Sequence, residues 1–212
     1  FYDSNSDYSK DLKEKFETHF EQRGGKVIRD IKLNNPKLNI IPELKNLSQD
    51  QVKAAMLFPS EKNIETALNI AKANANLNPN NRNQQGLRLF GGDSLYNHKI
   101  LKEGGEAVQG LTIVIPWSRE ESQANNFSEE AKEVWDGNVS WRTATSFDAT
   151  QAFIQALFQD ADREIVLNRL RNINLFPSDT SGFPLQFTDQ GERESEPVLV
   201  KVVDGEFKEL SE

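Results

Sequence analysis

The chain has 212 residues, enough for one large domain or one and a half ordinary ones. Its net charge of −8 makes a nucleic acid a poor partner, because an acidic surface repels phosphate groups. The absence of cysteine excludes disulfides, thiolate metal sites and a cysteine nucleophile, and no apolar run approaches the roughly 20 residues of a membrane span.

The first half of the chain alternates predicted helices and strands. An apolar residue at every fourth position from Tyr8 to Phe20 predicts a helix, which the glycine pair 24–25 ends. We expect strands and further helices in alternation along this half: strands over 26–33, 52–58, 87–90 and 111–115, and helices over 40–47, 60–71 and 100–107. This order is typical of an α/β fold with a mainly parallel central sheet.

The second half of the chain changes character after Trp117. Its segments are mostly helical, with helices predicted over 128–135, 145–158 and 163–172 and loops over 120–126 and 176–191. The apolar segment 197–203 predicts a last strand, which a hairpin-type turn at Asp204-Gly205 follows. In the first half, the Asn-rich segment 74–85 breaks the helical pattern and is expected to be a loop.

Candidate ligand contacts follow the predicted parallel strands, because ligands of such sheets bind at the carboxyl ends of the strands. The segments concerned are 3–8, 58–60, 91–93 and 116–117. Asp93 follows a strand and two glycines, so its carboxylate could hold an ammonium group there through a charge-assisted hydrogen bond. Aspartate also favours the position that caps a helix, and this alternative stays open.

Two other patterns match metal or catalytic sites only in part. Residues 3–14 have the acidic spacing of a calcium-binding loop, but Tyr8 stands where that loop needs glycine and Lys10 at a normally apolar position. His19 and His98 have no partner at metal-binding spacing, and no serine and acid are arranged around either. We therefore expect no metal, no cofactor and no catalytic residue.

One longer run resembles a known family. Residues 141–152, WRTATSFDATQA, resemble a stretch of type I periplasmic binding proteins of the Leu/Ile/Val-binding group, where an aromatic-Asp-Ala segment opens a helix ending in Ala-Leu. Further pieces follow in the family's order, at 3–12, 89–93, 110–117, 185–191 and 198–205. The ordered set, rather than any single motif, carries the resemblance. It implies a bilobed protein with three-layer αβα lobes that close on a ligand.

The resemblance also implies a division of the chain. Lobe two would comprise 1–117 and 197–212, and 118–196 would be a returning segment of lobe one with the hinge crossings. Phe1 then falls where lobe two begins, so the partner strands of lobe one would lie upstream. A chain with one incomplete lobe is expected to bind its ligand very weakly, and its uncovered helices could dimerise to hide an apolar face.

Four residues would contact the ligand in the family's arrangement. Tyr8 would supply an aromatic wall, Phe58 and Ser60 would lie in the turn after a strand, and Asp93 would hold an ammonium group. Segment 58–60 departs from the family pattern, in which an aromatic residue is followed by glycines, and this leaves the side-chain specificity open.

The function that the resemblance implies is non-enzymatic. It is that of a periplasmic or extracytoplasmic substrate-binding component of an ABC transporter for branched-chain or related amino acids. Its partners would be an amino acid or similar small molecule and the membrane permease. Two alternatives stay open: a ligand-sensing domain of a signalling receptor or kinase with the same fold, and a flavodoxin-like enzyme with titratable residues at the strand ends.

Overall fold

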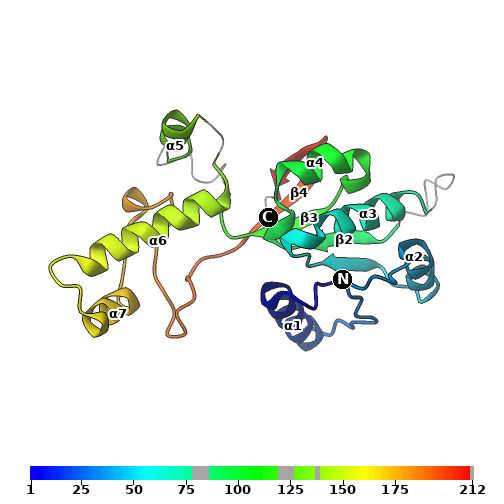
Figure 1. Cartoon of the computed structure of the whole chain (residues 1–212), viewed down its shortest axis with the longest axis horizontal. Helices are drawn as coiled ribbons and strands as arrows, with labels where there is room; N and C mark the ends of the chain where they lie inside the picture. The colour runs from blue at the N-terminus through cyan, green and yellow to red at the C-terminus, as the bar shows by residue number, and fades with distance from the viewer. Residues whose placement is uncertain (78–85, 119–126, 137–138, 211–212) are drawn as a thin grey trace. The chain divides into compact units, whose positions relative to one another are not determined.

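The computed structural model describes residues 1–77, 86–118, 127–136 and 139–210. The chain divides into two compact units, which are coloured by residue number in Figure 1. Unit 1 comprises Phe1–Val114 and Leu199–Glu212, and unit 2 comprises Ile115–Val198. Their assignment to lobe two and lobe one stays a prediction. The loop expected over 120–126 and most of the one expected over 74–85 lie outside the described residues.

The predicted α/β fold is confirmed by a five-stranded sheet. Its strands follow one another in sequence order: β1 (Ala54–Leu57), β2 (Arg88–Gly91), β3 (Thr112–Ile115), β4 (Val198–Val203) and β5 (Glu206–Glu209). The pairs β1–β2 and β2–β3 are parallel, whereas β4 and β5 form the antiparallel hairpin expected from Asp204-Gly205. Because the first three strands are parallel, their carboxyl ends lie at one edge of the sheet.

Helices cover both faces of the sheet in unit 1. They are α1 (Asp7–Gln22), α2 (Ile40–Gln49), α3 (Ile64–Ala75) and α4 (His98–Gly104). Neighbouring helices α2, α3 and α4 contact one another in turn, while α1 lies on the opposite side of the sheet (Figure 1). The buried face of α3 includes the residues expected from the helical spacing, namely Ile64, Ala67, Leu68 and Ala71. Local caps fix the starts of α1 and α4, where Ser6 and Asn97 accept backbone N–H groups.

The strand expected over 26–33 is wrong. Among the described residues this segment forms a single bridge, between Lys32 and Tyr2. Tyr2 in turn bridges Phe58, so the first residues of the chain lie between this segment and the end of β1. A strand forms only where a neighbouring segment provides a ladder of hydrogen bonds. Among the described residues, Tyr2 alone pairs with this segment.

Several helix bounds also differ from the predictions. The helix expected from Ser60 begins with a 3₁₀ turn at Glu61–Asn63, and the one expected over 100–107 is α4 followed by a 3₁₀ turn at Gly105–Val108. The helix expected over 145–158 begins at Trp141, because Ser140 and Thr143 form a reciprocal cap there. Boundaries depend on such local hydrogen bonds, which apolar spacing does not reveal.

Unit 2 is mainly helical, with α5 (Phe127–Trp135), α6 (Trp141–Leu157) and α7 (Arg163–Arg171). Its apolar residues form two small clusters, one around Trp117 and Phe127 and one around Ile173 and Leu185. The buried carboxylate of Asp148 accepts hydrogen bonds from the backbone and side chain of Ser181 at 2.6 and 2.8 Å and from Arg193 at 2.6 Å. This buried ion pair ties α6 to the two loop segments that follow α7.

Candidate functional site

The carboxyl ends of β1 and β2 bring several predicted site residues together. Asp93 directly follows β2 and the glycine pair, and Tyr8 lies in the first turn of α1. The Tyr8 hydroxyl donates a hydrogen bond to Oδ1 of Asp93, which joins α1 to the end of β2. Tyr8 is 40% exposed, so this pair lies at the surface of the sheet edge. Asp93 starts a 3₁₀ turn, Asp93–Leu95, and its side chain faces Tyr8.

Gly92 allows the close approach of α1 to this edge. A Cβ atom at this position would lie 3.3 Å from the Tyr8 hydroxyl oxygen and 3.1 Å from Cδ1 of Leu12. Both distances are tighter than normal van der Waals contact, so a side chain at this position would force the Tyr8 and Leu12 side chains of α1 to shift. Gly92 thus leaves room for the α1 side chains at the end of β2.

Phe58 and Ser60 occupy more interior positions than the sequence suggests. Phe58 is buried, and its ring packs against Phe16 of α1 with the ring centroids 5.9 Å apart. It therefore supports the site from within and has little surface to offer a ligand. The Ser60 hydroxyl donates to Oδ2 of Asp3 at 2.5 Å, so its proton is already engaged by a protein carboxylate.

Asp3, in the first of the candidate segments, organises this edge through its hydrogen bonds. Its buried carboxylate accepts hydrogen bonds from Ser60, from Asn63 at 2.7 Å and from the backbone of Asn5 at 2.9 Å. Its backbone N–H donates to the hydroxyl of Ser9 at 2.7 Å, and that hydroxyl donates to the carbonyl of Phe58. This network holds the turn before α1 against the turn after β1. In the segment that partly matches a calcium-binding loop, the Asp3 carboxylate thus accepts hydrogen bonds from protein groups.

Burial and hydrogen bonds shift the pKa values of Asp3 and Tyr8 at this edge. Burial acts to raise the pKa of Asp3, but the hydrogen bonds from Ser60, Asn5 and Asn63 outweigh it and hold that pKa below its ordinary value. Burial, reinforced by the hydrogen bond to Asp93 and by its charge, raises the pKa of Tyr8 well above its ordinary value. Tyr8 is therefore a hydrogen-bond donor throughout the physiological range.

The chemistry available at this edge is that of cation binding. An ionised carboxylate accepts through two oxygens, and Tyr8 occupies Oδ1 of Asp93. Among the described residues no donor contacts its other oxygen, which can take an N–H group of an ammonium ligand.

The described residues contain no group of three acidic or histidine side chains that could hold a metal ion. None of the described helices has the length and apolar character of a membrane span.

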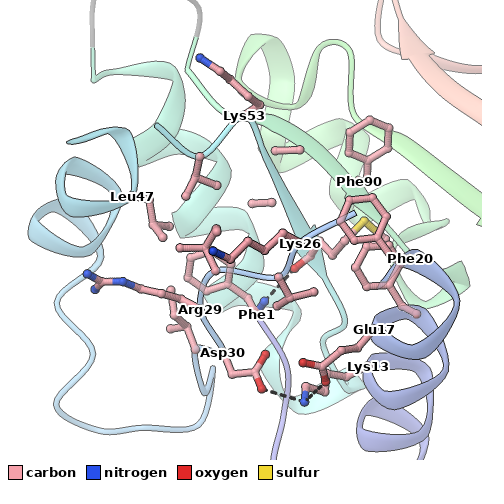
Figure 2. Close-up of a pocket in the computed structure, with 18 of the residues that line it drawn as sticks. Phe1, Lys13, Glu17, Phe20, Lys26, Arg29, Asp30, Leu47, Lys53 and Phe90 are labelled. Carbon is pink, nitrogen blue, oxygen red and sulfur yellow. Dashed lines mark hydrogen bonds and ion pairs between the residues drawn. The ribbon is translucent and has the colours of Figure 1, made fainter. Parts of the chain in front are cut away.

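Other segments singled out in the sequence lie elsewhere. Trp117 is buried in unit 2, where its indole N–H donates to the carbonyl of Ser181 at 2.9 Å. His19 lies in the last turn of α1 and His98 in the first turn of α4. A cavity of about 590 Å³ in unit 1 is lined by Phe58 but not by Tyr8, Ser60 or Asp93 (Figure 2).

Comparison with known proteins decides the family. Residues 1–206 match the periplasmic binding protein family. The chain belongs to this family. No curated protein sequence matches the chain.

Solved structures share the fold of this family member at low sequence identity. A leucine binding protein from Thermotoga maritima is 19% identical with a TM-score of 0.78, and the match covers 100% of this chain and 58% of that one. A branched-chain amino acid ABC transporter protein from Thermus thermophilus with bound valine is 14% identical, with a TM-score of 0.70 and coverages of 100% and 58%. A solute binding protein from R. palustris in complex with benzoate is 16% identical, with a TM-score of 0.73 and coverages of 96% and 55%. The chain thus spans less than two thirds of the length of these proteins.

Proposed function

We propose that this chain is part of the substrate-binding component of an ABC transporter for branched-chain or related amino acids. The observation that carries the proposal is the Tyr8–Asp93 pair at the carboxyl ends of parallel strands. Membership of the periplasmic binding protein family supports it, as do structural neighbours named for leucine and valine. The role is binding and involves no covalent chemistry.

Asp93 would hold the ammonium group of the ligand. Its free oxygen accepts an N–H group while Tyr8 fixes the other oxygen, so the carboxylate is oriented before the ligand arrives. The exposed part of the Tyr8 ring would form one wall of the site. Phe58 and Ser60 would act indirectly, because the first is buried and the second is bonded to Asp3. One neighbour carries benzoate, so the side-chain preference within amino acids and related acids is a separate question.

In this proposal the chain carries about half of a binding site. Unit 1 would be lobe two, and unit 2 would be the returning segment of lobe one. Binding would occur when the two lobes close on the ligand by a hinge motion. The whole protein would act in the periplasm or another extracytoplasmic space, and its partner would be the membrane permease of the transporter.

A titration with leucine and 4-methylpentanoate tests the role of Asp93. The two molecules share the side chain and carboxylate, but only leucine has the ammonium group. We expect leucine at millimolar concentrations to shift the backbone NMR signals of Gly92 and Asp93, and 4-methylpentanoate to leave them unchanged. Asp93→Asn should abolish the shift.

Glu103→Gln is the matched control, because it removes one negative charge from an exposed position on α4 of the same unit. This variant should retain the leucine-dependent shift. Equal shifts with the two molecules, or a shift that survives in Asp93→Asn, would contradict the proposed ammonium site.

A further inference from the structure

The chain passes between its two units twice. One passage lies at the end of β3, because unit 1 runs to Val114 and unit 2 begins at Ile115. The other lies at the start of β4, because unit 2 ends at Val198 and unit 1 resumes at Leu199. The strands β3 and β4 are neighbours in the sheet, so both passages belong to adjacent strands. The residues on the unit 2 side of each passage decide how freely the chain can bend there.

Trp117 holds the first passage. It lies two positions after Ile115 and is buried. Its indole N–H donates to the carbonyl of Ser181 at 2.9 Å, and its ring packs edge-on against Phe127 with the ring centroids 6.2 Å apart. Pro116 alone separates β3 from this fixed residue, and its own ring restrains φ to about −65°.

Arg193 holds the second passage. Its Nη1 donates to Oδ2 of Asp148 at 2.6 Å, and the two side chains form a largely buried ion pair. The N–H of the next residue, Glu194, donates to the carbonyl of Gln186 at 2.9 Å, so this residue is also tied to unit 2. Residues 195–197 remain between these bonds and β4, and they are exposed and lack regular secondary structure.

The carboxylate of Asp148 joins the two fixed points. Its Oδ1 accepts from the backbone N–H of Ser181 at 2.6 Å, and its Oδ2 accepts from the Ser181 hydroxyl at 2.8 Å. A continuous chain of hydrogen bonds therefore runs from Trp117 through Ser181 and Asp148 to Arg193. Ser181 and Asp148 are buried, and hydrogen bonds are stronger in such surroundings than in water.

We propose that Asp148 is a positioning residue that anchors both passages to α6 and confines hinge motion to Pro116 and residues 195–197. Its two oxygens accept from separate segments of the chain at once, which a single donor or acceptor could not do. Hinges are formed by a few loop or element-terminal residues, and these four positions are of that kind. The inference rests on the hinge motion of the proposed function but not on the ligand site at Asp93, so its test uses the chain without ligand.

Arg193→Gln tests whether the two passages share one anchor. Loss of the guanidinium should loosen Asp148 and, through Ser181, the bond from Trp117. We expect the Trp117 indole N–H to exchange with solvent deuterium at least about tenfold faster. The amide of Ala156, a buried residue near the end of α6, reports the stability of unit 2 as a whole and should change by less than about threefold.

The matched control is Arg163→Gln, the same substitution at an exposed position at the start of α7. It should leave the exchange of the Trp117 indole unchanged. Arg193→Lys keeps a cation that can donate to Asp148 and should restore most of the protection of the indole.

A second readout measures the hinge itself. The chain has no cysteine, so spin labels can be attached through Lys102→Cys on α4 and Arg171→Cys on α7, both at exposed positions. Pulsed electron resonance gives the distribution of distances between the two labels. We expect Arg193→Gln to broaden this distribution by at least about 1.5-fold. Trp117→Phe keeps an aromatic ring but lacks the indole N–H, so it releases the first passage and should also broaden the distribution, even if Arg193→Gln fails to fold.

Three results would overturn the proposal. Indole exchange that Arg193→Gln leaves unchanged would show that packing alone holds Trp117. Equal acceleration at Ala156 would show that the whole of unit 2 has loosened, rather than the anchor. A distance distribution that keeps its width in both Arg193→Gln and Trp117→Phe would show that this network does not restrain the hinge.

Discussion

The hydroxyl of Tyr8 donates a hydrogen bond to the carboxylate of Asp93, although 85 positions separate the two residues in the sequence. The contact joins the first turn of α1 to the end of β2. It fixes one carboxylate oxygen, and Gly92 makes it sterically feasible. The Tyr8 hydroxyl therefore helps to fix the orientation of the Asp93 carboxylate.

Tyr8→Phe should loosen this edge with little effect on folding. The pair is partly exposed, so we expect a loss of at most about 1 kcal/mol in the free energy of unfolding. The leucine-dependent shift at Asp93 should become smaller, because the carboxylate is no longer oriented. Tyr2→Phe removes a hydroxyl group elsewhere in unit 1 and should change neither quantity. A loss above about 3 kcal/mol for Tyr8→Phe would show that the pair is a folding element instead.

Asp3→Asn should destabilise unit 1 at neutral pH. The folded-state pKa of Asp3 lies below the ordinary aspartate pKa of 3.8, so its stabilising contribution is fully present above pH 3.8. The contribution is lost as the pH falls through the folded-state pKa. We expect a loss of about 1–3 kcal/mol at pH 7 that shrinks as the pH falls below 3.8, measured by urea unfolding at several pH values. A loss that is independent of pH would contradict the role of the ionised carboxylate.

In a polypeptide that begins at Phe1, unit 1 should become more stable as the pH rises from about 6 to 8. The pKa of the Phe1 amino group is lowered by burial from 8.0 to about 6, so the unfolded chain binds more protons in this window. The shift corresponds to about 3 kcal/mol.

Several charged groups face or line the cavity that holds the Phe1 amine: Lys13, Glu17, Lys26, Arg29, Asp30, Lys53 and Arg88. Acetylation of the Phe1 nitrogen leaves all of them in place and removes only the titrating group. It should therefore abolish the pH dependence between about 6 and 8 in urea unfolding followed by tyrosine. An unchanged dependence after acetylation would assign it to other groups.

Asp148→Ala should strongly destabilise unit 2. The carboxylate is 1% exposed, and its removal leaves the largely buried Arg193 and the Ser181 hydroxyl without their acceptor. Breaking a buried pair in this way costs about 3–5 kcal/mol. Tryptophan fluorescence reports unit 2 alone, because all three tryptophans lie there. Glu133→Gln, at an exposed position on α5, is the control, and an equal effect of both variants would rule out a specific role for the pair.

Much of the fold could be predicted from local patterns. The apolar run 52–58 contains β1, and the four-residue spacing from Tyr8 to Phe20 lies within α1. The strand prediction for 26–33 was wrong because a strand needs a neighbouring strand to pair with, and apolar periodicity does not show which neighbour is present. The 3₁₀ turn before α3 was missed for a similar reason, since it depends on local hydrogen bonding.

For the candidate site, the sequence predicted only which segments follow the ends of the strands. The sequence placed Tyr8 at the start of a helix and Asp93 after a strand. The hydrogen bond between them could not be predicted, because it depends on how the helix packs against the sheet. Asp3 lies in the candidate segment 3–8, but its role as an acceptor could not be predicted, because its donors Ser60 and Asn63 lie 57 and 60 positions away. A ligand contact of Phe58 stays a prediction, and its packing against Phe16 of α1 could not be read from the sequence.

The affinity of the 212-residue chain for leucine, measured by titration calorimetry, tests the central claim most directly. The claim is that Asp93 and Tyr8 form one half of an amino acid site. Because unit 1 would supply only the ammonium contact, we predict a dissociation constant no tighter than about 1 mM, weakened further by Asp93→Asn. Micromolar binding that Asp93→Asn leaves unchanged would contradict the account.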